Sequence, residues 1–196
     1  MKRLRPALLW TAVLAGGVGL WAGQKLDTSS RQGPGSVSET EKDPGPGSDP
    51  AGGPVVAGIG DPLPAIVLPD LAGAPVDLQR FHGRPLLINV WASWCGPCVE
   101  EMPELARFAT AQGDQGVQVL GLALDTAEGV REFLRRVPVD YPIVLETPGP
   151  ADASVRLGNT QGLLPYTVLV DAQGRIVRQK LGPFVHGEIE GWATGE

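Results

Sequence analysis

The sequence predicts an α/β domain in which helices flank a central mixed sheet, with an N-terminal β-hairpin and a central insertion. Three observations predict this class. Apolar runs of strand length alternate with segments of helical periodicity in the first half of residues 58–196, and a hairpin followed by a helix closes the second half. The third observation is size, because these residues suffice for one domain with a full hydrophobic core.

The first half is expected to contain a hairpin and then a β-α-β unit. Its strands are short apolar, β-rich runs, and the first two are separated by a turn at Ala72-Gly73. Its second helix has Val130, Phe133 and Leu134 at helical spacing. In chain order we expect strands at Ile66–Leu68, Pro75–Leu78 and Leu86–Trp91, a helix at Val99–Ala111, a strand at Val117–Leu124 and a helix at Ala127–Arg136.

The second half is expected to begin with the insertion and to end with a hairpin and a helix. The hairpin strands are joined by the turn sequence Asp171-Ala172-Gln173-Gly174. In chain order we expect a short strand at Tyr141–Leu145, a short helix around Ala151–Leu157, the hairpin strands Tyr166–Val170 and Arg175–Leu181, and a closing helix at His186–Trp192.

The N-terminus is expected to be an uncleaved signal anchor over residues 1–23. Lys2, Arg3 and Arg5 precede about 17 uncharged, mostly apolar residues, which is at the short end for a membrane span. A cleaved signal peptide has the same order of charge and hydrophobicity, but the sequence Gly19-Leu20-Trp21-Ala22 offers no clean small-x-small cleavage site. Either alternative predicts export, which in bacteria means the periplasmic side of the cytoplasmic membrane.

Residues 24–57 are expected to be a disordered tether between this anchor and the domain. Gly, Pro, Ser and Asp dominate the segment, so it cannot bury enough apolar surface to offset the entropy of ordering.

The whole chain carries a formal net charge of −6. This acidity argues against nucleic acid as a partner and against a domain that lies flat on an anionic membrane.

Both cysteines of the chain lie in the pentapeptide Trp94-Cys95-Gly96-Pro97-Cys98. A disulfide across so short a loop constrains little of the unfolded chain, which argues against a structural crosslink. A closed zinc site needs four ligands, and beyond the two cysteines only His82 and His186 are present, neither at metal-ligand spacing. We therefore predict a redox-active dithiol, with no metal and no other cofactor.

The dithiol follows a predicted buried strand and precedes a predicted helix. The unpaired amides and the positive end of the helix dipole favour a thiolate at this position. We therefore expect Cys95 to have a depressed pKa and to be the attacking nucleophile. Cys98, one turn into the helix, would resolve the mixed disulfide.

The segment from Trp91 to Cys98, followed by Glu100-Glu101-Met102-Pro103, closely resembles the thioredoxin superfamily and most of all its membrane-anchored TlpA/ResA-like branch. The resemblance runs from about Gly58 to Gly182 and includes residues 77–85 and 164–171. It implies a thioredoxin fold, a thiol-disulfide oxidoreductase and a monomer.

The resemblance also implies the substrate groove. Pro165 is at the position of a proline that is cis in thioredoxin-like proteins and lies against the disulfide, so Pro165 and Leu164 are expected to form one wall. An extended substrate segment can pair with the backbone there. Trp94 is expected to cover the disulfide or to contact a partner. Gly96-Pro97 is the pair found in reducing thioredoxins.

For two residues near the dithiol, Glu101 and Asn89, the resemblance implies different capacities to transfer a proton. Glu101 matches the active-site acid of the ResA-like branch, so we expect it to be partly desolvated and to manage the proton of Cys98. The alternative is an exposed first-turn glutamate, as we expect of Glu100 and Glu104. Asn89 occupies the place of the buried aspartate of cytoplasmic thioredoxins, and an amide cannot transfer that proton.

The function expected from the resemblance is a membrane-tethered reductase. It would receive electrons from a membrane dithiol donor and pass them to exported cysteine-containing proteins, such as apocytochrome c or a copper-site assembly protein. Relatives dedicated to cytochrome c often carry Glu after the groove proline, where this chain has Tyr166.

A disulfide-donating oxidase and a non-enzymatic Cu(I) carrier remain as alternatives. A thiol peroxidase is disfavoured, because Ile88 and Ala92 stand where its motif requires Pro and Thr.

Overall fold

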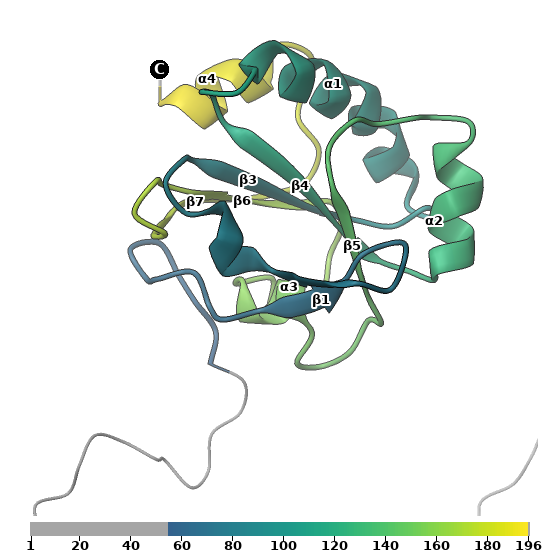
Figure 1. The fold of residues 1–196 in the computed structure, drawn as a ribbon, viewed down its shortest axis with the longest axis horizontal. Coiled ribbons are helices and arrows are strands. Elements are labelled where there is room, and N and C mark those ends of the chain that lie inside the picture. Colours follow the sequence, from purple (N-terminus) through teal and green to yellow (C-terminus); the bar gives the residue numbers. More distant parts are fainter. Residues whose placement is uncertain (1–54, 196) are drawn as a thin grey trace, which may run out of the picture. The chain divides into compact units, whose positions relative to one another are not determined.

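The computed structural model describes residues 55–195 and contains two β-sheets (Figure 1). A small antiparallel sheet pairs β1 (Val67–Pro69) with β2 (Pro75–Asp77). The main sheet has five strands in the order β5-β4-β3-β6-β7, with β3–β4 and β4–β5 parallel and the other two pairs antiparallel. Its strands are β3 (Leu86–Trp91), β4 (Gln118–Leu124), β5 (Ile143–Glu146), β6 (Tyr166–Val170) and β7 (Ile176–Leu181).

Helices cover one face of the main sheet, and the hairpin and a short helix cover the other (Figure 1). The helices are α1 (Gly96–Gln112), α2 (Ala127–Leu134), α3 (Ala153–Arg156) and α4 (Glu188–Thr194), with a 3₁₀ turn η1 at Leu78–Phe81. The hydrophobic core accordingly divides into two clusters. One cluster lies under α1, α2 and α4, and the other lies under the β1–β2 hairpin, η1 and α3.

The central strand β3 explains the continuous apolar run of the sequence. All six of its residues are buried, as in parallel-sheet strands that are covered on both faces. Leu86, Ile88 and Val90 point into the hairpin-side cluster. Leu87 and Trp91 point into the cluster under α1, and Asn89 shares their face because side chains alternate along a strand. A polar side chain is thereby placed beneath the helix that carries the dithiol.

The predicted α/β class is confirmed, and the element bounds differ from the expected ones for local reasons. The first helix begins at Gly96 rather than Val99 and continues through Pro103, because Cys95 already acts as its N-cap. Leu78 leaves the predicted strand for η1, which the sequence did not predict and which the Asp77 carboxylate caps. The closing helix begins at Glu188, because Gly187 adopts a left-handed conformation with φ of 78°.

The insertion strand and the last hairpin are also shorter than expected. The insertion strand starts at Ile143, since Pro142 has no N–H to donate to the sheet. The strand expected from Arg175 starts one residue later, because the Asp171 carboxylate accepts the backbone N–H groups of Gln173 and Arg175 and holds them in the turn. The expected helix over Ala127–Arg136 ends at Leu134.

The predicted anchor at residues 1–23 lies outside the described residues, as does most of the predicted tether. Between residues 55 and 195, no helix is both long and apolar enough to cross a membrane. Ala57 is buried, and its N–H donates to the carbonyl of Arg156 at 2.9 Å. The chain is therefore packed onto the domain from this residue onward.

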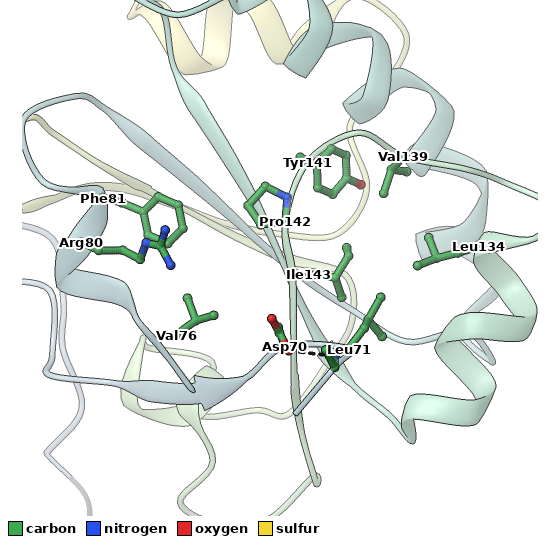
Figure 2. A pocket seen from close by; sticks show the side chains of 11 residues that line it. Asp70, Leu71, Val76, Arg80, Phe81, Leu134, Val139, Tyr141, Pro142 and Ile143 are labelled. Atoms are coloured by element: carbon green, nitrogen blue, oxygen red, sulfur yellow. Dashed lines mark hydrogen bonds between the residues drawn. The ribbon is translucent and has the colours of Figure 1, made fainter. Parts of the chain in front are cut away.

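A mostly apolar pocket of about 470 Å³ lies between the hairpin turn, η1 and the segment before β5 (Figure 2). Its lining includes Leu71, Phe81, Leu134 and Tyr141. None of the residues that line it belongs to the dithiol site described below. Both cysteines therefore lie outside this pocket.

Candidate active site

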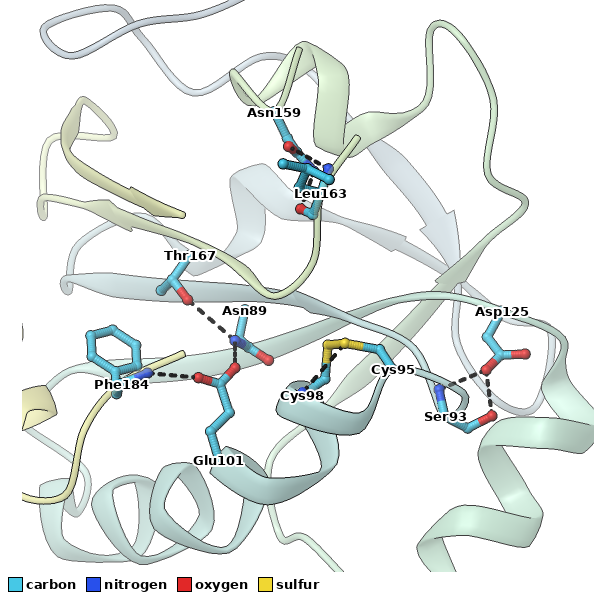
Figure 3. Close-up of a disulfide and its surroundings, with 10 residues drawn as sticks. All are labelled: Asn89, Ser93, Cys95, Cys98, Glu101, Asp125, Asn159, Leu163, Thr167 and Phe184. Atoms are coloured by element: carbon cyan, nitrogen blue, oxygen red, sulfur yellow. Dashed lines mark hydrogen bonds between the residues drawn. A yellow bond between two sulfur atoms is a disulfide. The ribbon is translucent and has the colours of Figure 1, made fainter. Parts of the chain in front are cut away.

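Cys95 and Cys98 form a disulfide at the N-terminus of α1, with their Cα atoms 5.3 Å apart (Figure 3). Cys95 is the N-cap, and its Sγ accepts the backbone N–H of Cys98 at 3.3 Å. Pro97 fits the first turn of the helix because its missing N–H would have no partner there. The strand-to-helix turn thus presents two sulfur atoms where the helix offers free amides and the positive end of its dipole.

The two sulfur positions differ in accessibility. Cys95 retains 7% of its surface exposed, whereas Cys98 is completely buried. An incoming or attacking thiol can therefore reach Cys95 but not Cys98, and the helix terminus favours a thiolate at Cys95. The roles predicted for the two cysteines, attack by Cys95 and resolution by Cys98, would make use of this difference.

Glu101, one turn after Cys98, is buried beneath α1 with only 4% of its surface exposed. Its Oε1 accepts Nδ2 of Asn89 at 2.8 Å, and its Oε2 accepts the backbone N–H of Phe184 at 3.0 Å. Burial raises the pKa of this carboxyl from 4.5 to about 7, although both hydrogen bonds and Lys180 oppose the rise. Glu101 is therefore not the exposed first-turn glutamate that was the alternative.

Asn89 links the central strands to this carboxyl group. Its Nδ2 also donates to Oγ1 of Thr167 on β6 at 3.2 Å, and both side chains are fully buried. The carboxyl group of Glu101 is thus connected to β3, to β6 and, through Phe184, to the segment between β7 and α4.

The loop before β6 forms the other side of the site. The Leu164–Pro165 peptide bond is cis, Pro165 is buried, and Leu164 packs against the core cluster that contains both cysteines. Asn159 holds this loop: its Nδ2 donates to the carbonyl of Leu163 at 3.0 Å, and its Oδ1 accepts the N–H of Leu163 at 3.3 Å (Figure 3). Asn159 was not predicted from the sequence.

The segment between β3 and the dithiol is fixed by a second residue that the sequence analysis missed. One carboxylate oxygen of Asp125 accepts both the N–H of Ser93 at 2.8 Å and its Oγ–H at 2.6 Å (Figure 3). Ser93 and Asp125 follow the ends of the parallel strands β3 and β4. Adjacent parallel strands end at the same edge of a sheet, and this could have suggested the contact.

The remaining predicted residues lie at the surface or serve the fold. Trp94 is 68% exposed, and Gly96 and Pro97 are exposed beside it, so this side of the dithiol is open to a partner. The histidines lie elsewhere: His186 contacts Glu104, and His82 packs against Gly174. Within residues 55–195 there is no group of three or more His, Cys, Asp or Glu side chains that could hold a metal ion.

Comparison with known proteins places these features in a family. The Redoxin family model matches residues 59–193. The chain is 30% identical over 133 residues to the thiol-disulfide oxidoreductase ResA of Geobacillus kaustophilus, covering 67% of this chain and 74% of that protein.

Two solved structures are similar over most of the described residues. A thioredoxin-related protein from Neisseria meningitidis serogroup B has a TM-score of 0.54 at 32% identity, covering 65% of this chain and 93% of that one. A thiol-disulfide oxidoreductase from Bacteroides fragilis has a TM-score of 0.57 at 25% identity, covering 69% and 98%. The resemblance to the ResA-like branch and its fold is confirmed.

Proposed function

The chain belongs to the Redoxin family and to its ResA-like thiol-disulfide oxidoreductases, and from this premise we propose that it reduces disulfides in exported client proteins. The observation that carries the proposal is the pairing of a cysteine that keeps 7% of its surface exposed and a fully buried cysteine with a buried carboxyl group one turn away. The Gly96-Pro97 pair supports the reducing direction. It is the pair found in reducing thioredoxins.

The reaction takes place in two exchange steps. The thiolate of Cys95 attacks a client disulfide, so that a Cys95–client bond forms and the first client thiolate leaves. Cys98 then loses its proton and attacks Sγ of Cys95. The intramolecular disulfide forms, the second client thiolate leaves, and two electrons have passed to the client.

Glu101 would hold the proton that Cys98 gives up in the second step. A proton acceptor works best when its pKa is near the working pH, and burial brings the pKa of Glu101 to about 7. The fixed orientation of its carboxyl group, between Asn89 and Phe184, adds a positional reason. Because Cys98 is buried, no base from outside the domain can reach its thiol, and this also supports Glu101 as the proton acceptor.

The client would bind across the open side of the dithiol. Trp94, Gly96 and Pro97 border it on one side, with Leu164 and Pro165 on the other. Trp94 and the neighbouring Leu163 are exposed apolar side chains, at 68% and 51%. An extended client segment could pair with the backbone before β6 while its apolar side chains contact these two residues. The proposed client site lies outside the 470 Å³ pocket, whose lining contains none of these residues.

We place the domain on the outer side of the bacterial cytoplasmic membrane, tethered by residues 1–23, with a membrane dithiol as electron donor. The basic residues before the uncharged N-terminal stretch support this placement. Apocytochrome c and copper-site assembly proteins are the proposed clients. Tyr166, which follows the groove proline, favours a client range that is not confined to cytochromes.

Trapping of the mixed disulfide tests the function. The Cys98→Ser chain, reduced and mixed with a peptide whose Cys-x-x-Cys-His cysteines form a disulfide, should accumulate a covalent adduct at Cys95 that mass spectrometry detects. The Cys95→Ser chain is the matched control and should form none. The unmodified reduced chain should release fully reduced peptide. If the oxidised chain instead oxidised the reduced peptide while the reduced chain left the disulfide intact, the proposed direction would be wrong.

A further inference from the structure

Asn89 contacts the buried carboxyl group from the central strand, and only part of its hydrogen-bonding capacity is used. Its side chain is fully buried on β3. Both protons of Nδ2 are donated, one to Oε1 of Glu101 at 2.8 Å and one to Oγ1 of Thr167 at 3.2 Å. The same amide therefore holds the carboxyl group in place and ties it to β6.

The oxygen of this amide has no hydrogen-bond partner. A buried polar atom without a partner is costly and calls for an explanation. Figure 3 shows Oδ1 on the side of the amide that is turned toward the disulfide. Asn89 also shares its face of β3 with Leu87 and Trp91, which belong to the core cluster that contains Cys98. The unused acceptor is therefore available to a group on the disulfide side of the amide.

We propose that Asn89 is a positioning residue that couples the protonation of Cys98 to that of Glu101 by turning its side-chain amide. The inference rests on the proposed function, in which Glu101 holds the proton of Cys98 during the second exchange step.

Two orientations of the amide match the two arrangements of the proton. While Cys98 is a thiol and Glu101 a carboxylate, Oδ1 accepts the S–H and Nδ2 donates to the carboxylate. In the second arrangement the S–H bond of Cys98 has broken and an O–H bond has formed on Glu101. A half-turn about the Cβ–Cγ bond then brings Nδ2 to the thiolate and Oδ1 to the new O–H. One proton changes place, no electron moves, and each charged group keeps a hydrogen-bond donor.

None of the other described groups around Glu101 is suited to couple its protonation to that of Cys98. Lys180 on β7 favours the carboxylate and Glu188 on α4 disfavours it, and these two are paired with each other at 2.9 Å. Burial keeps the pKa of Tyr141 far above neutrality, so this phenol does not exchange protons. The N–H of Phe184 can stay on Oε2 in both arrangements, so the carboxyl group need not move.

NMR spectroscopy of the full chain with labelled asparagine and glutamate side chains tests the turn directly. In the reduced protein, the Asn89 Cγ and Nδ2 resonances should change with pH at the same midpoint as the carboxyl carbon of Glu101. Cγ should move downfield as Glu101 takes its proton, because Oδ1 then accepts a stronger hydrogen bond. In the Glu101→Gln chain these Asn89 resonances should not titrate with that midpoint. An Asn89 Cγ that stays constant while Glu101 titrates would overturn the proposal.

Kinetics of a matched pair of variants give the second readout. Asn89→Leu keeps the approximate shape of the side chain but removes both hydrogen-bonding groups, whereas Thr167→Val removes only the hydroxyl partner. We expect Asn89→Leu to slow resolution of a Cys95–client adduct by about tenfold or more, the equivalent of one hydrogen bond to a charged group. Thr167→Val should change the rate by less than about threefold. Equal rates in the unmodified and Asn89→Leu chains would contradict the coupling.

The inference and the proposed function can fail separately. An oxidising potential of the cysteine pair would overturn the reducing direction, but the Asn89 and Glu101 resonances could still titrate together. A constant Asn89 Cγ would remove the coupling and leave the reductase activity as it stands. The measurement on the unmodified chain also decides the matter if Asn89→Leu does not fold.

Discussion

Two glutamates one turn apart on α1 have the same kind of hydrogen-bond partner, but their pKa values are shifted in opposite directions. Glu101 and Glu104 each accept a backbone N–H from the segment between β7 and α4, from Phe184 and Gly187 respectively. Burial nevertheless raises the pKa of Glu101 to about 7, whereas the Gly187 hydrogen bond lowers the pKa of Glu104. Hydrogen bonds alone therefore do not set the acidity of a carboxyl group. The depth at which the group lies decides which effect dominates.

The difference suits Glu101 to the chemical role proposed for it and Glu104 to a structural one. Glu101 faces the core cluster beneath the dithiol, where a neutral acid is stable near neutral pH. Glu104 lies nearer to solvent, and it also contacts Nδ1 of His186 at 3.0 Å. It stays ionised and fastens the segment between β7 and α4 to the helix. In the proposed mechanism, one turn of this helix supplies both a proton acceptor, Glu101, and a residue that fastens the segment between β7 and α4, Glu104.

The largest effect is expected when Glu101 can no longer take a proton. Glu101→Gln keeps the shape and one hydrogen-bond acceptor but cannot take a proton, so resolution of the Cys95–client adduct should slow by about 100-fold or more near neutral pH. Glu104→Gln is the matched control and should change this rate by less than about threefold. Stopped-flow measurement of client release gives both rates. Equal effects of the two substitutions would remove the special role of Glu101.

The pH dependence of stability should have opposite signs at the two sites. The pKa of Glu101 is higher in the folded chain than in the unfolded one. Its contribution is therefore fully present below about pH 4.5 and is lost as pH rises through about 7. The loss corresponds to about 3 kcal/mol. Chemical denaturation of the oxidised chain should show this decline, and the Glu101→Gln chain should lack it.

Glu104 should behave in the reverse way, with a smaller effect. Its pKa is lowered by folding, so its contribution is present above the pKa of the unfolded state and is lost as pH falls through the folded value. The Glu104→Gln chain should therefore lose stability relative to the unmodified chain at neutral pH and approach it in acid. A loss that persisted unchanged in acid would indicate packing, not charge.

A smaller effect is expected at Gly187, the backbone partner of Glu104. Gly187 has φ of 78°, a conformation that L side chains rarely adopt, and its N–H donates to Glu104. Gly187→Ala should destabilise the domain by about 1–2 kcal/mol in equilibrium unfolding. Gly96→Ala is a suitable control, because Gly96 has no positive φ and an added Cβ would meet no atom within 4 Å. Equal stabilities of the two variants would show that the backbone conformation at Gly187 is not a constraint.

The smallest effect is expected at His186, the exposed side-chain partner of Glu104. The side chain of His186 is 88% exposed where it contacts Glu104. An exposed pair of this kind contributes little, so His186→Ala should change the free energy of unfolding by less than about 0.5 kcal/mol. Thermal and chemical denaturation can measure this. A larger loss would mean that His186, and not the Gly187 amide, holds the segment.

The parts of this site that short-range patterns encode could be predicted from the sequence. The cysteine pair is recognisable from its two-residue spacing. The strand before it is recognisable because burial on both faces makes a continuous apolar run. Glu101 and Pro165 were identified only through the resemblance to a family, since their own neighbours in sequence do not mark them as buried.

The residues that were missed make contacts between distant parts of the chain. Phe184 lies 83 positions from Glu101, and Asp125 lies 32 positions from Ser93. No periodicity links such pairs. Asn89 was correctly located but interpreted only as an absent acid, because its use as a hydrogen-bond partner depends on Glu101 and Thr167, which the fold brings to it.

The reduction potential of the Cys95–Cys98 pair in the full chain decides between a reductase and a disulfide donor. Equilibration against dithiothreitol or glutathione buffers, followed by thiol alkylation and mass spectrometry, gives the ratio of reduced to oxidised protein. A reductase should have a value near or below about −250 mV, in the range of thioredoxin. A value near about −120 mV, as in strongly oxidising relatives, would rule out the reducing direction and make this protein a disulfide donor.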